Sequence, residues 1–421
     1  MRLASKVAVS GIVVILACRL ADRSAQAQSF GVDLRNTLMP ASGGMAGTSI
    51  AAPQDLISGI NANPATLTQF HGTQFIVGGA WAEPTFNLAQ TGDIGLPADP
   101  LITPFAAKSQ TPGSAVPNIG VTQEMEAYGL PVTLGLGLVG AAGGGTDFRD
   151  EPESNGTSTY LSILEFAGAA GARLTDRLSA GAALFVGTGY LDGPFVGDGA
   201  MTSAYALRGS VGLSYALTDT TSLGVYYQSV ERFRFKDEVR LELLDGAFDI
   251  VRDVHLSLPQ NVGLGIANSS AMDGRLLLAA DVVFLDWCSA ALFRQIYLPQ
   301  WVVQVGAQYS LNSRCRFRLG YAWAENPIDP NTGTSVAGIP VPGGVGAVKY
   351  LQAQFAVVSQ HRFAAGVGLS DVLPGLDFDA FAGGMFRASD QLGDLTSVNI
   401  ESYWIGLGFT WRFDRGCCSA N

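Results

Sequence analysis

The chain has 421 residues, of which 48% are hydrophobic and only 14% are charged, against about 25% charged residues in an ordinary soluble domain. So low a charge content favours a protein whose surface is turned largely toward something other than water. The formal net charge of -11 argues against nucleic acid as a partner, because affinity for nucleic acid comes largely from clustered Lys and Arg. The 52 glycines follow no three-residue period, which excludes a collagen-like chain.

The first 27 residues have the order of a secretory signal peptide. Arg2 and Lys6 precede an apolar run that is too short to cross a bilayer, and the small-residue cleavage site Ala25-Gln26-Ala27 follows it. We expect the mature chain to begin at Gln28 with a net charge of -14, because cleavage removes four basic residues and one acidic residue. A lipid-modified Cys18 is the alternative, since the residues before it loosely resemble a lipoprotein site.

The cysteines and the hydropathy pattern narrow the fold class. The four cysteines of the mature chain, Cys288, Cys315, Cys417 and Cys418, match no C-x-x-C spacing and are too sparse to staple a fold. The last two could pair with other chains or stay reduced. Beyond the signal peptide no apolar run reaches the roughly 18 residues that a membrane helix needs. If the chain spans a membrane, it must be a barrel, because only helices and closed barrels satisfy every backbone polar group in hydrocarbon.

Large apolar residues alternate with small or polar ones along most of the chain. Residues 301–311 place Trp, Val, Val, Ala, Tyr and Leu at the odd positions, and residues 403–413 repeat this pattern with Tyr, Ile, Leu, Phe, Trp and Phe. A period of two is typical of a strand. Aromatic residues such as Tyr205 and Tyr215 fall at strand ends, as in the aromatic girdles of membrane barrels. A soluble sandwich would carry more Lys and Glu on its wet face, so we predict an all-β transmembrane barrel.

The lengths of the connections predict the number of strands and the orientation. Short links alternate with longer ones, and outer-membrane barrels have short periplasmic turns and long external loops. Counting strands from Thr73 to Phe413 gives 14. The longer connections are expected at residues 87–115, 143–157, 192–199, 237–252, 288–299, 326–357 and 388–397. The predicted organisation is a signal peptide (1–27), a hatch or plug segment (28–72), the barrel (73–413) and a C-terminal tail (414–421).

Several short motifs follow one another in a characteristic order. They are Ser42-Gly43-Gly44-Met45-Ala46-Gly47, Ala51-Ala52-Pro53-Gln54-Asp55, Asn63-Pro64-Ala65, and residues 173–181, 223–229, 258–265 and 318–321. Together they resemble the long-chain fatty-acid transporter (FadL-like, toluene-transporter) family, of which the Asn-Pro-Ala triplet is the best-known marker. The resemblance implies a 14-stranded antiparallel transmembrane β-barrel with an N-terminal hatch inside the lumen. It also implies diffusive uptake of hydrophobic molecules such as long-chain fatty acids or aromatic hydrocarbons.

The chain departs from the family pattern at two places. The loop at residues 192–199 is short where well-studied relatives carry a large apolar external loop, so that the entry groove is absent or rebuilt. Barrels of this kind usually end on an aromatic residue that the barrel-assembly machinery, an expected partner, recognises. Here Phe413 is followed by eight further residues.

The resemblance points to two candidate sites. Asn63-Pro64-Ala65 would set where the hatch enters the barrel, and its alternative role is a merely structural turn before the first strand. Gly143, Gly144 and Gly145 are candidates for the strand kink that opens a lateral exit in relatives, because Gly weakens strand pairing and marks bulges. A plain flexible start of a loop is the alternative for these glycines.

Three arginines point into the lumen on the alternation. Arg208, Arg318 and Arg412 could meet a ligand carboxylate or a hatch acid such as Asp33 or Asp55, and ion pairing within the barrel is the alternative. On the lipid-facing side, Val305→Arg and Leu407→Arg should be costly, whereas Gly306→Ser on the luminal side should be mild.

We expect a non-enzymatic transporter without cofactor or metal. None of the three His residues lies at motif distance from a Ser elbow or from a second His. The expected partners are hydrophobic small molecules and the lipids of a Gram-negative-type outer membrane, and the barrel is expected to be a monomer. The alternatives are a structural or adhesive barrel and a general porin. A porin should lack the hatch motifs and apolar loop segments such as residues 241–244.

Overall fold

A computed structural model describes residues 28–29, 32–96, 99–193, 201–243, 248–336, 339–341, 343–357 and 360–413 of the chain. The predicted signal peptide, Cys18 and the C-terminal tail with Cys417 and Cys418 lie outside these residues. Most of the short loop predicted at 192–199 also lies outside them.

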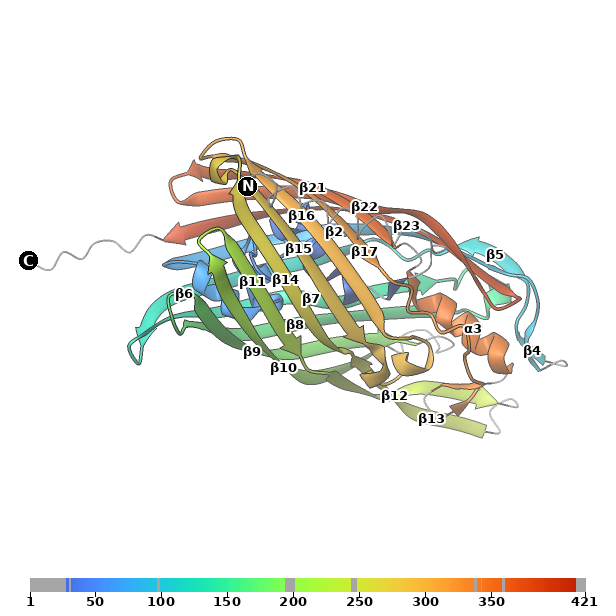
Figure 1. Cartoon of the computed structure of the whole chain (residues 1–421). Coiled ribbons are helices and arrows are strands. Elements are labelled where there is room, and N and C mark those ends of the chain that lie inside the picture. The colour runs from blue at the N-terminus through green and yellow to red at the C-terminus, as the bar shows by residue number, and fades with distance from the viewer. Residues whose placement is uncertain are drawn as a thin grey trace, which may run out of the picture.

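Fourteen long strands form a closed antiparallel ring, each strand pairing with its two neighbours (Figure 1). They are β2 (Thr73–Gln90), β6 (Ser114–Ala127), β7 (Leu130–Asp147), β8 (Ser158–Arg173), β9 (Leu178–Asp192), β10 (Thr202–Thr218), β11 (Thr221–Gln228), β14 (Gln260–Ala271), β15 (Leu276–Asp286), β16 (Gln300–Ser310), β17 (Cys315–Ala324), β21 (His361–Leu373), β22 (Leu376–Leu392) and β23 (Thr396–Phe413). The ring closes where β23 pairs with β2. The prediction of a 14-stranded antiparallel barrel is confirmed.

Shorter elements lie at the two ends and inside the ring. The remaining strands are β1 (Gln28–Ser29), β3 (Ile94–Leu96), β4 (Asp99–Ile102), β5 (Phe105–Lys108), β12 (Glu231–Leu243), β13 (Phe248–Leu258), β18 (Ser335–Val336), β19 (Ile339–Pro340) and β20 (Ala356–Val357). The α-helices are α2 (Leu56–Asn61) and α3 (Gly344–Phe355). The 3-10 helices are η1 (Val32–Leu38), η2 (Ser42–Met45), η3 (Pro64–Gln69), η4 (Pro152–Ser154), η5 (Met272–Gly274), η6 (Trp287–Ser289) and η7 (Phe293–Gln295). No helix among the described residues has the length and apolar character needed to cross a membrane.

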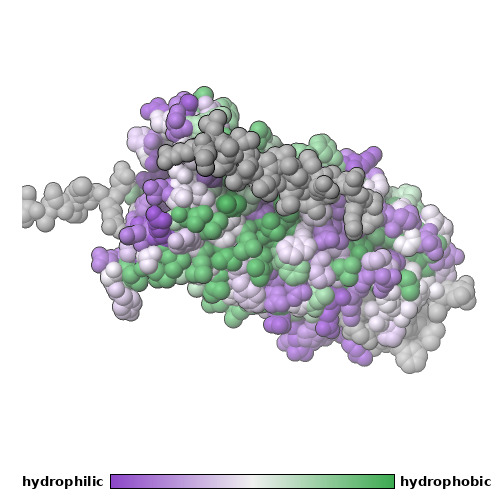
Figure 2. Space-filling model, in the orientation of Figure 1, coloured by the Kyte–Doolittle hydropathy of each residue, from purple (hydrophilic) through white to green (hydrophobic). Residues whose placement is uncertain are grey.

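The two faces of the strands differ as the alternation predicts. On β23 the outward side chains of Tyr403, Ile405 and Leu407 are exposed, whereas Trp404 and Ser402 face inward and are buried. Apolar side chains gather over the middle of the barrel surface and hydrophilic ones toward its ends (Figure 2). An exposed apolar belt around a closed ring is the surface that hydrocarbon, and not water, would cover.

One end of the barrel has short turns and the other has long connections, and we call them the short-turn end and the long-loop end. At the short-turn end β6 and β7 are joined by Tyr128 and Gly129, both with positive φ (54° and 74°), the backbone that a two-residue hairpin turn needs. The long-loop end holds α3 and the β12–β13 hairpin (Figure 1).

Two of the predicted long loops are wrong. Residues 388–397 are mostly strand, since β22 runs to Leu392 and β23 begins at Thr396. Residues 237–252 lie largely in the paired strands β12 and β13. At residues 388–397 the strands extend past the apolar belt, where exposed residues such as Ser389 and Gln391 are polar and resemble loop residues in the sequence.

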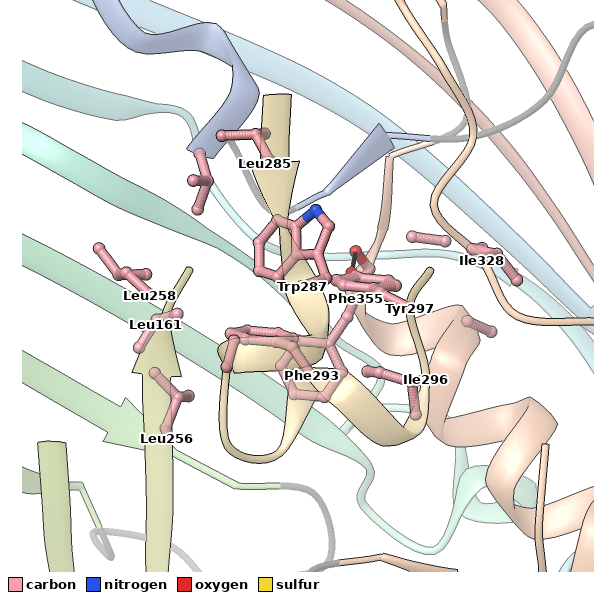
Figure 3. Close-up of a cluster of buried hydrophobic side chains, with 14 of the residues drawn as sticks. Leu161, Leu256, Leu258, Leu285, Trp287, Phe293, Ile296, Tyr297, Ile328 and Phe355 are labelled. Atoms are coloured by element: carbon pink, nitrogen blue, oxygen red, sulfur yellow. Dashed lines mark hydrogen bonds between the residues drawn. The ribbon is translucent and has the colours of Figure 1, made fainter. Parts of the chain in front are cut away.

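An aromatic cluster fills the lumen at the long-loop end (Figure 3). Trp287, Phe293, Tyr297 and Phe355 are buried, and the rings of Phe293 and Tyr297 stack with their centroids 5.3 Å apart. The Tyr297 hydroxyl donates to the carbonyl oxygen of Phe355 at 2.9 Å, which ties the loop after β15 to the end of α3. This packing joins the loop after β15 and the end of α3 into one buried cluster at the long-loop end.

Candidate functional site

The N-terminal segment, residues 32–72, runs inside the ring of strands at the short-turn half. Its helices η2, α2 and η3 are almost entirely buried. The Asp281 carboxylate of β15 accepts hydrogen bonds from the backbone N–H groups of Ser49 (2.6 Å) and Ile50 (2.9 Å). On other sides of the ring, Gln304 of β16 donates to Ala46 O at 2.7 Å and Asn118 of β6 donates to Leu38 O at 2.8 Å. The segment is therefore held from several directions.

Glycines on the inner face of the strands let this segment approach the wall. A Cβ added at Gly320 would lie 2.1 Å from the backbone carbon of Met45, one at Gly181 would lie 2.4 Å from Pro64 C, and one at Gly224 would lie 2.3 Å from Ile50 O. Side chains cannot occupy such positions without displacing backbone. The small residues that alternate along the strands thus form the inner surface against which the N-terminal segment packs.

This finding contradicts one expectation from the sequence. A Cβ at Gly306 would lie 2.8 Å from both Cβ and Cε of Met45. Gly306→Ser is therefore not a mild change, because the luminal face at this position is packed against the N-terminal segment instead of facing open space.

Asn63 sits at a junction between the segment and the wall. It is the N-cap of η3, where its side-chain oxygen accepts from Ala65 N at 3.2 Å, and Pro64 occupies the first helical position. Its amide nitrogen donates to Ile50 O and to Leu213 O of β10, both at 3.0 Å. The side chain is fully buried, so one amide joins two parts of the segment to the barrel wall.

The three luminal arginines are each paired with an acid of the barrel or its loops. Arg208 Nε lies 2.6 Å from Glu165 Oε1, and its guanidinium lies 5.1 Å from the centre of the Phe185 ring. Arg318 donates to Asp379 at 2.6 Å.

Arg412 lies at the short-turn end, where it pairs with Asp371 at 2.6 Å and is partly exposed. The acid Asp55 binds the backbone N–H groups of Ala41 and Ser42 instead of an arginine. The side chain of Asp33 is outside the described part of the structure. The arrangement favours ion pairing within the barrel over a waiting anion site at all three arginines.

Sequence reasoning missed a fourth arginine and its acceptors. Arg35 donates to Gln228 Oε1 at 3.0 Å and to Asn261 Oδ1 at 2.8 Å, and its guanidinium lies 4.9 Å from the Tyr226 ring centre. Its φ of 33° is left-handed, which an ordinary side chain rarely adopts. Asp281 was missed for the same reason: the partners of both residues are distant in sequence, and no local motif marks them.

The wall is incomplete between β6 and β7. Their ladder runs from the pair Ala127–Leu130 at the short-turn end to the pair Ile119–Leu138 and stops there. Above that point β6 remains paired with β2, and β7 remains paired with β8 as far as Asp147. Among the described residues, the next backbone hydrogen bond to β7 on this side comes from Gln110, which precedes β6 and donates its N–H to Asp147 O at 2.9 Å. A stretch of wall in the long-loop half therefore lacks a ladder of backbone hydrogen bonds.

Side chains fill this gap. A Cβ added at Gly140 of β7 would lie 2.7 Å from Cγ1 of Val116 on β6, and Val139 beside it is buried. Pro117 has no N–H to donate, which limits how far β6 can extend its ladder. The gap is thus closed by apolar contacts.

The candidate glycines lie beside this gap, not at an irregularity of their own. Gly143, Gly144 and Gly145 pair in regular order with Ser162, Leu161 and Tyr160 of β8. The register shift of β7 falls two or three residues earlier, between Gly140 and Ala142. The glycines therefore lie in the part of β7 that pairs with β8 but not with β6. The bulge lies between these glycines and the short-turn end.

A second junction joins β10 to β12. Ser229 N donates to Gly209 O at 2.9 Å, and the Thr202 hydroxyl donates to the Glu238 carboxylate. Between these two points β12 runs beside β10 without a ladder between them. Burial raises the pKa of Glu238 to about 7.

The described residues contain no group of three or more His, Cys, Asp and Glu side chains placed to hold a metal ion. Among them, Cys288 and Cys315 are free thiols. His361 Nδ1 lies 2.7 Å from the Tyr321 hydroxyl on the outer surface, away from the lumen.

Comparison with known proteins supports the fold. No protein-family model and no curated protein matches the sequence. The fold is similar to that of the Pseudomonas putida toluene transporter TodX (TM-score 0.65, 16% identity, 89% of this chain and 98% of that one). It is also similar to a Pseudomonas aeruginosa FadL homologue (0.66, 16%, 91% and 99%) and to the Ralstonia pickettii toluene transporter TbuX (0.62, 17%, 89% and 98%). The resemblance inferred from the motifs is confirmed at this level: the chain has the fold of FadL homologues and toluene transporters.

Proposed function

We propose that the protein is an outer-membrane channel for the diffusive uptake of hydrophobic molecules, such as long-chain fatty acids or aromatic hydrocarbons. The solved structures that it resembles include toluene transporters and a monoaromatic hydrocarbon channel. An apolar molecule crosses the polar outer surface of the outer membrane poorly, so a protein must offer it an apolar route. A closed barrel with an apolar outer belt is suited to that role.

The short turns at one end of the barrel and the long loops at the other indicate the proposed orientation in the membrane. Residues 1–27 are a signal peptide that is cleaved before Gln28, and the short-turn end faces the periplasm. Residues 28–72 act as the hatch of a barrel formed by residues 73–413, and residues 414–421 form a tail. N-terminal sequencing of the outer-membrane protein tests this start, since an acylated Cys18 would contradict it.

The main support for the proposal is the position of the N-terminal segment inside the barrel. It occupies the short-turn half of the lumen and is held by Asp281, Gln304, Asn118 and Asn63 from different strands. An open water-filled pore, as in a general porin, would need this half of the lumen to be clear. The segment is thus a plug, which favours a gated channel for specific cargo.

A lateral exit through the gap between β6 and β7 completes the route. At the gap Val116 of β6 lies against Gly140 of β7, and within the described residues no backbone ladder joins the two strands there. Separating these side chains breaks no backbone hydrogen bond, so an apolar molecule could pass from the lumen into the outer leaflet at modest cost. Movement runs down a gradient, with hatch motion around Asn63 releasing the cargo.

An uptake assay separates this proposal from its alternatives. Cells lacking their own hydrophobic-compound transporters would express the full chain, a porin or an empty vector, and accumulation of a labelled long-chain fatty acid and of labelled toluene would be measured. Uptake of at least one compound above the porin control supports the proposal. Uptake of neither, with the barrel present in the outer membrane, would favour a structural or adhesive barrel. Rapid entry of sugars would favour a general porin.

A further inference from the structure

The strand β12 carries basic residues on the outer surface of the wall. Its buried residues Glu231, Phe233 and Phe235 reach the inner face of β9, where a Cβ at Gly187 would lie 2.0 Å from the Glu231 carboxylate oxygen. Arg232 and Arg234 alternate with these residues and are exposed, and exposed Lys236 follows. Because side chains of a strand alternate between two faces, Arg232 and Arg234 point away from the lumen.

Two contacts fix the height of these residues on the barrel. Ser229 N donates to Gly209 O, and the Thr202 hydroxyl donates to Glu238. Counting from the first contact places Arg232 and Arg234 opposite residues 206 and 204 of β10, and counting from the second places them opposite residues 208 and 206. The two arginines therefore lie at the height of Leu207 and Tyr205, whose outward side chains are strongly exposed, at 61% and 74%. Tyr205 is the aromatic residue at the long-loop edge of the apolar belt, so the basic residues lie at the edge of the membrane.

Within the residues that the structure describes, only one of the three cations on this surface is paired with an acid. Arg234 pairs with Asp253 of β13 at 2.7 Å, and the exposed acid Asp237 lies next to Lys236. Within the described part of the chain, neither the guanidinium of Arg232 nor the ammonium of Lys236 has a hydrogen bond or an ion pair. The exposed His255 is the cross-strand partner of Arg234 and adds no acid to this face.

An unpaired arginine facing lipid is tolerated near an interface and is costly at the bilayer midplane. Its long side chain can reach the headgroup layer, where phosphates are the abundant anions and accept paired hydrogen bonds from the guanidinium. These cations lie beside the strongly exposed Leu207 and Tyr205, at the edge of the apolar belt, so the anions of the surrounding membrane are the ones within their reach.

We propose that Arg232, Arg234 and Lys236 form a binding surface for the phosphate groups of glycolipids in the outer leaflet of the outer membrane. This inference rests on the proposed membrane placement of the barrel. Bound glycolipid would lie against β12 at the junction with β10, where no ladder joins the two strands. It would brace the outer side of a junction that the protein itself closes with few hydrogen bonds.

The test measures binding of a lipopolysaccharide that consists of lipid A and the phosphorylated inner core to the full mature barrel in detergent. The same lipopolysaccharide after enzymatic removal of its phosphates is the second probe. The test variant is Arg232→Gln with Lys236→Gln. The matched control is Arg177→Gln with Arg314→Gln, which removes two exposed charges from the short-turn end. Arg232→Lys keeps the charge and is expected to retain most of the affinity.

We expect the test variant to bind the phosphorylated probe about 30-fold more weakly than the control does, because each basic residue at a charged membrane surface contributes roughly a fivefold gain. The dephosphorylated probe should bind all variants equally weakly. Equal affinity of the test and control variants, or tight binding of the dephosphorylated probe, would overturn the inference. Uptake of hydrophobic compounds is scored separately, so a channel without lipid specificity and a lipid-binding barrel without uptake give different results.

Discussion

Two seams of the barrel wall, separated by the seam between β2 and β6, are closed in different ways. At the seam between β2 and β23 the ladder runs the full length of both strands, from the pair Thr73–Phe413 to the pair Gln90–Thr396. At the seam between β6 and β7 it stops at Ile119, although β7 is as long as β2. Strand length therefore does not decide whether the wall is sealed. Local sequence does: Pro117 and the bulge after Gly140 fall where the ladder ends.

This difference in backbone hydrogen bonding means that the two seams differ in how easily their strands can separate. A fully laddered seam resists separation, because every buried backbone group would lose its partner in hydrocarbon. A seam held by Val116 against Gly140 can part without that penalty. With the short-turn half filled by the N-terminal segment, the weak seam is the easier way out of the lumen.

The largest effect is expected in the lipid-facing surface of the sealed seam. Leu407→Arg places a charge on the outward face of β23 and should cost about 2 to 4 kcal/mol of stability if the position is near the midplane. Val305→Arg on β16 should behave alike. Urea titrations in lipid vesicles measure both, with Ser397→Arg near the long-loop end of β23 as the control. Equal tolerance of Leu407→Arg and Ser397→Arg would mean that the belt is misplaced.

The next effect concerns the seating of the N-terminal segment inside the barrel. Gly320→Val forces a side chain into the backbone of Met45 and Ala46 and should destabilise the seating of the N-terminal segment by about 1 to 3 kcal/mol. Single-channel conductance should rise, because the short-turn half opens to water. Gly168→Val is the control, since Gly168 faces outward with its nearest neighbouring atom 3.8 Å away. Equal conductance of the two variants would contradict the seating.

A comparable or smaller effect is expected at Asn63. Asn63→Ala with Pro64→Ala removes the cap of η3 and leaves Leu213 O without its amide donor, at a cost of about 1 to 3 kcal/mol. The barrel should stay folded while uptake changes. Uptake is compared at matched amounts of folded barrel, with Asn268→Ala at the short-turn end as the control. Unchanged uptake would leave Asn63-Pro64-Ala65 with a purely structural role.

The smallest effect extends the comparison to the junction between β10 and β12, which also lacks a ladder. Burial raises the pKa of Glu238 from 4.5 to about 7. The carboxyl of Glu238 is therefore more readily protonated when the β12–β13 hairpin is packed against β10 than when it is detached. The attachment of the β12–β13 hairpin to β10 is therefore most stable below pH 4.5. It becomes less stable as the pH rises to about 7 and changes no further above that. Proteolytic nicking of the hairpin should be faster at pH 8 than at pH 5. Glu238→Gln should remove this dependence, and a variant that retains it would assign the effect to another group.

The strand ring could be predicted from the sequence because the lipid outside it enforces a strict period of two, as at Ile405 and Leu407. Where strands rise above the lipid that constraint ends, which is why residues 388–397 looked like a loop. The hatch motif was visible as a local pattern at Asn63.

The contacts of the site could not be predicted in the same way. Arg208 and Glu165, or Asp281 and Ser49, are joined only by the closed ring and share no local signal. The sequence shows that the inner strand face is rich in glycine. Only the structure shows that the N-terminal segment packs against these glycines. The end of the β6–β7 ladder likewise depends on two strands at once.

A reversible cross-link between β6 and β7 tests the proposal that hydrophobic molecules leave the lumen through this seam. A Cβ at Gly140 would lie 4.0 Å from Cβ of Val116, within the range that a disulfide spans. Val116→Cys with Gly140→Cys would be made after replacing the other cysteines of the mature chain by Ser, and Ala89→Cys with Ser397→Cys would lock the sealed seam as the control.

Uptake of the labelled substrate is measured before and after reduction, with the extent of cross-linking recorded. We expect the oxidised cross-link between β6 and β7 to lower uptake at least tenfold, reduction to restore uptake, and the control cross-link to have no effect. Full uptake through a barrel whose β6–β7 seam is completely cross-linked would contradict the lateral route.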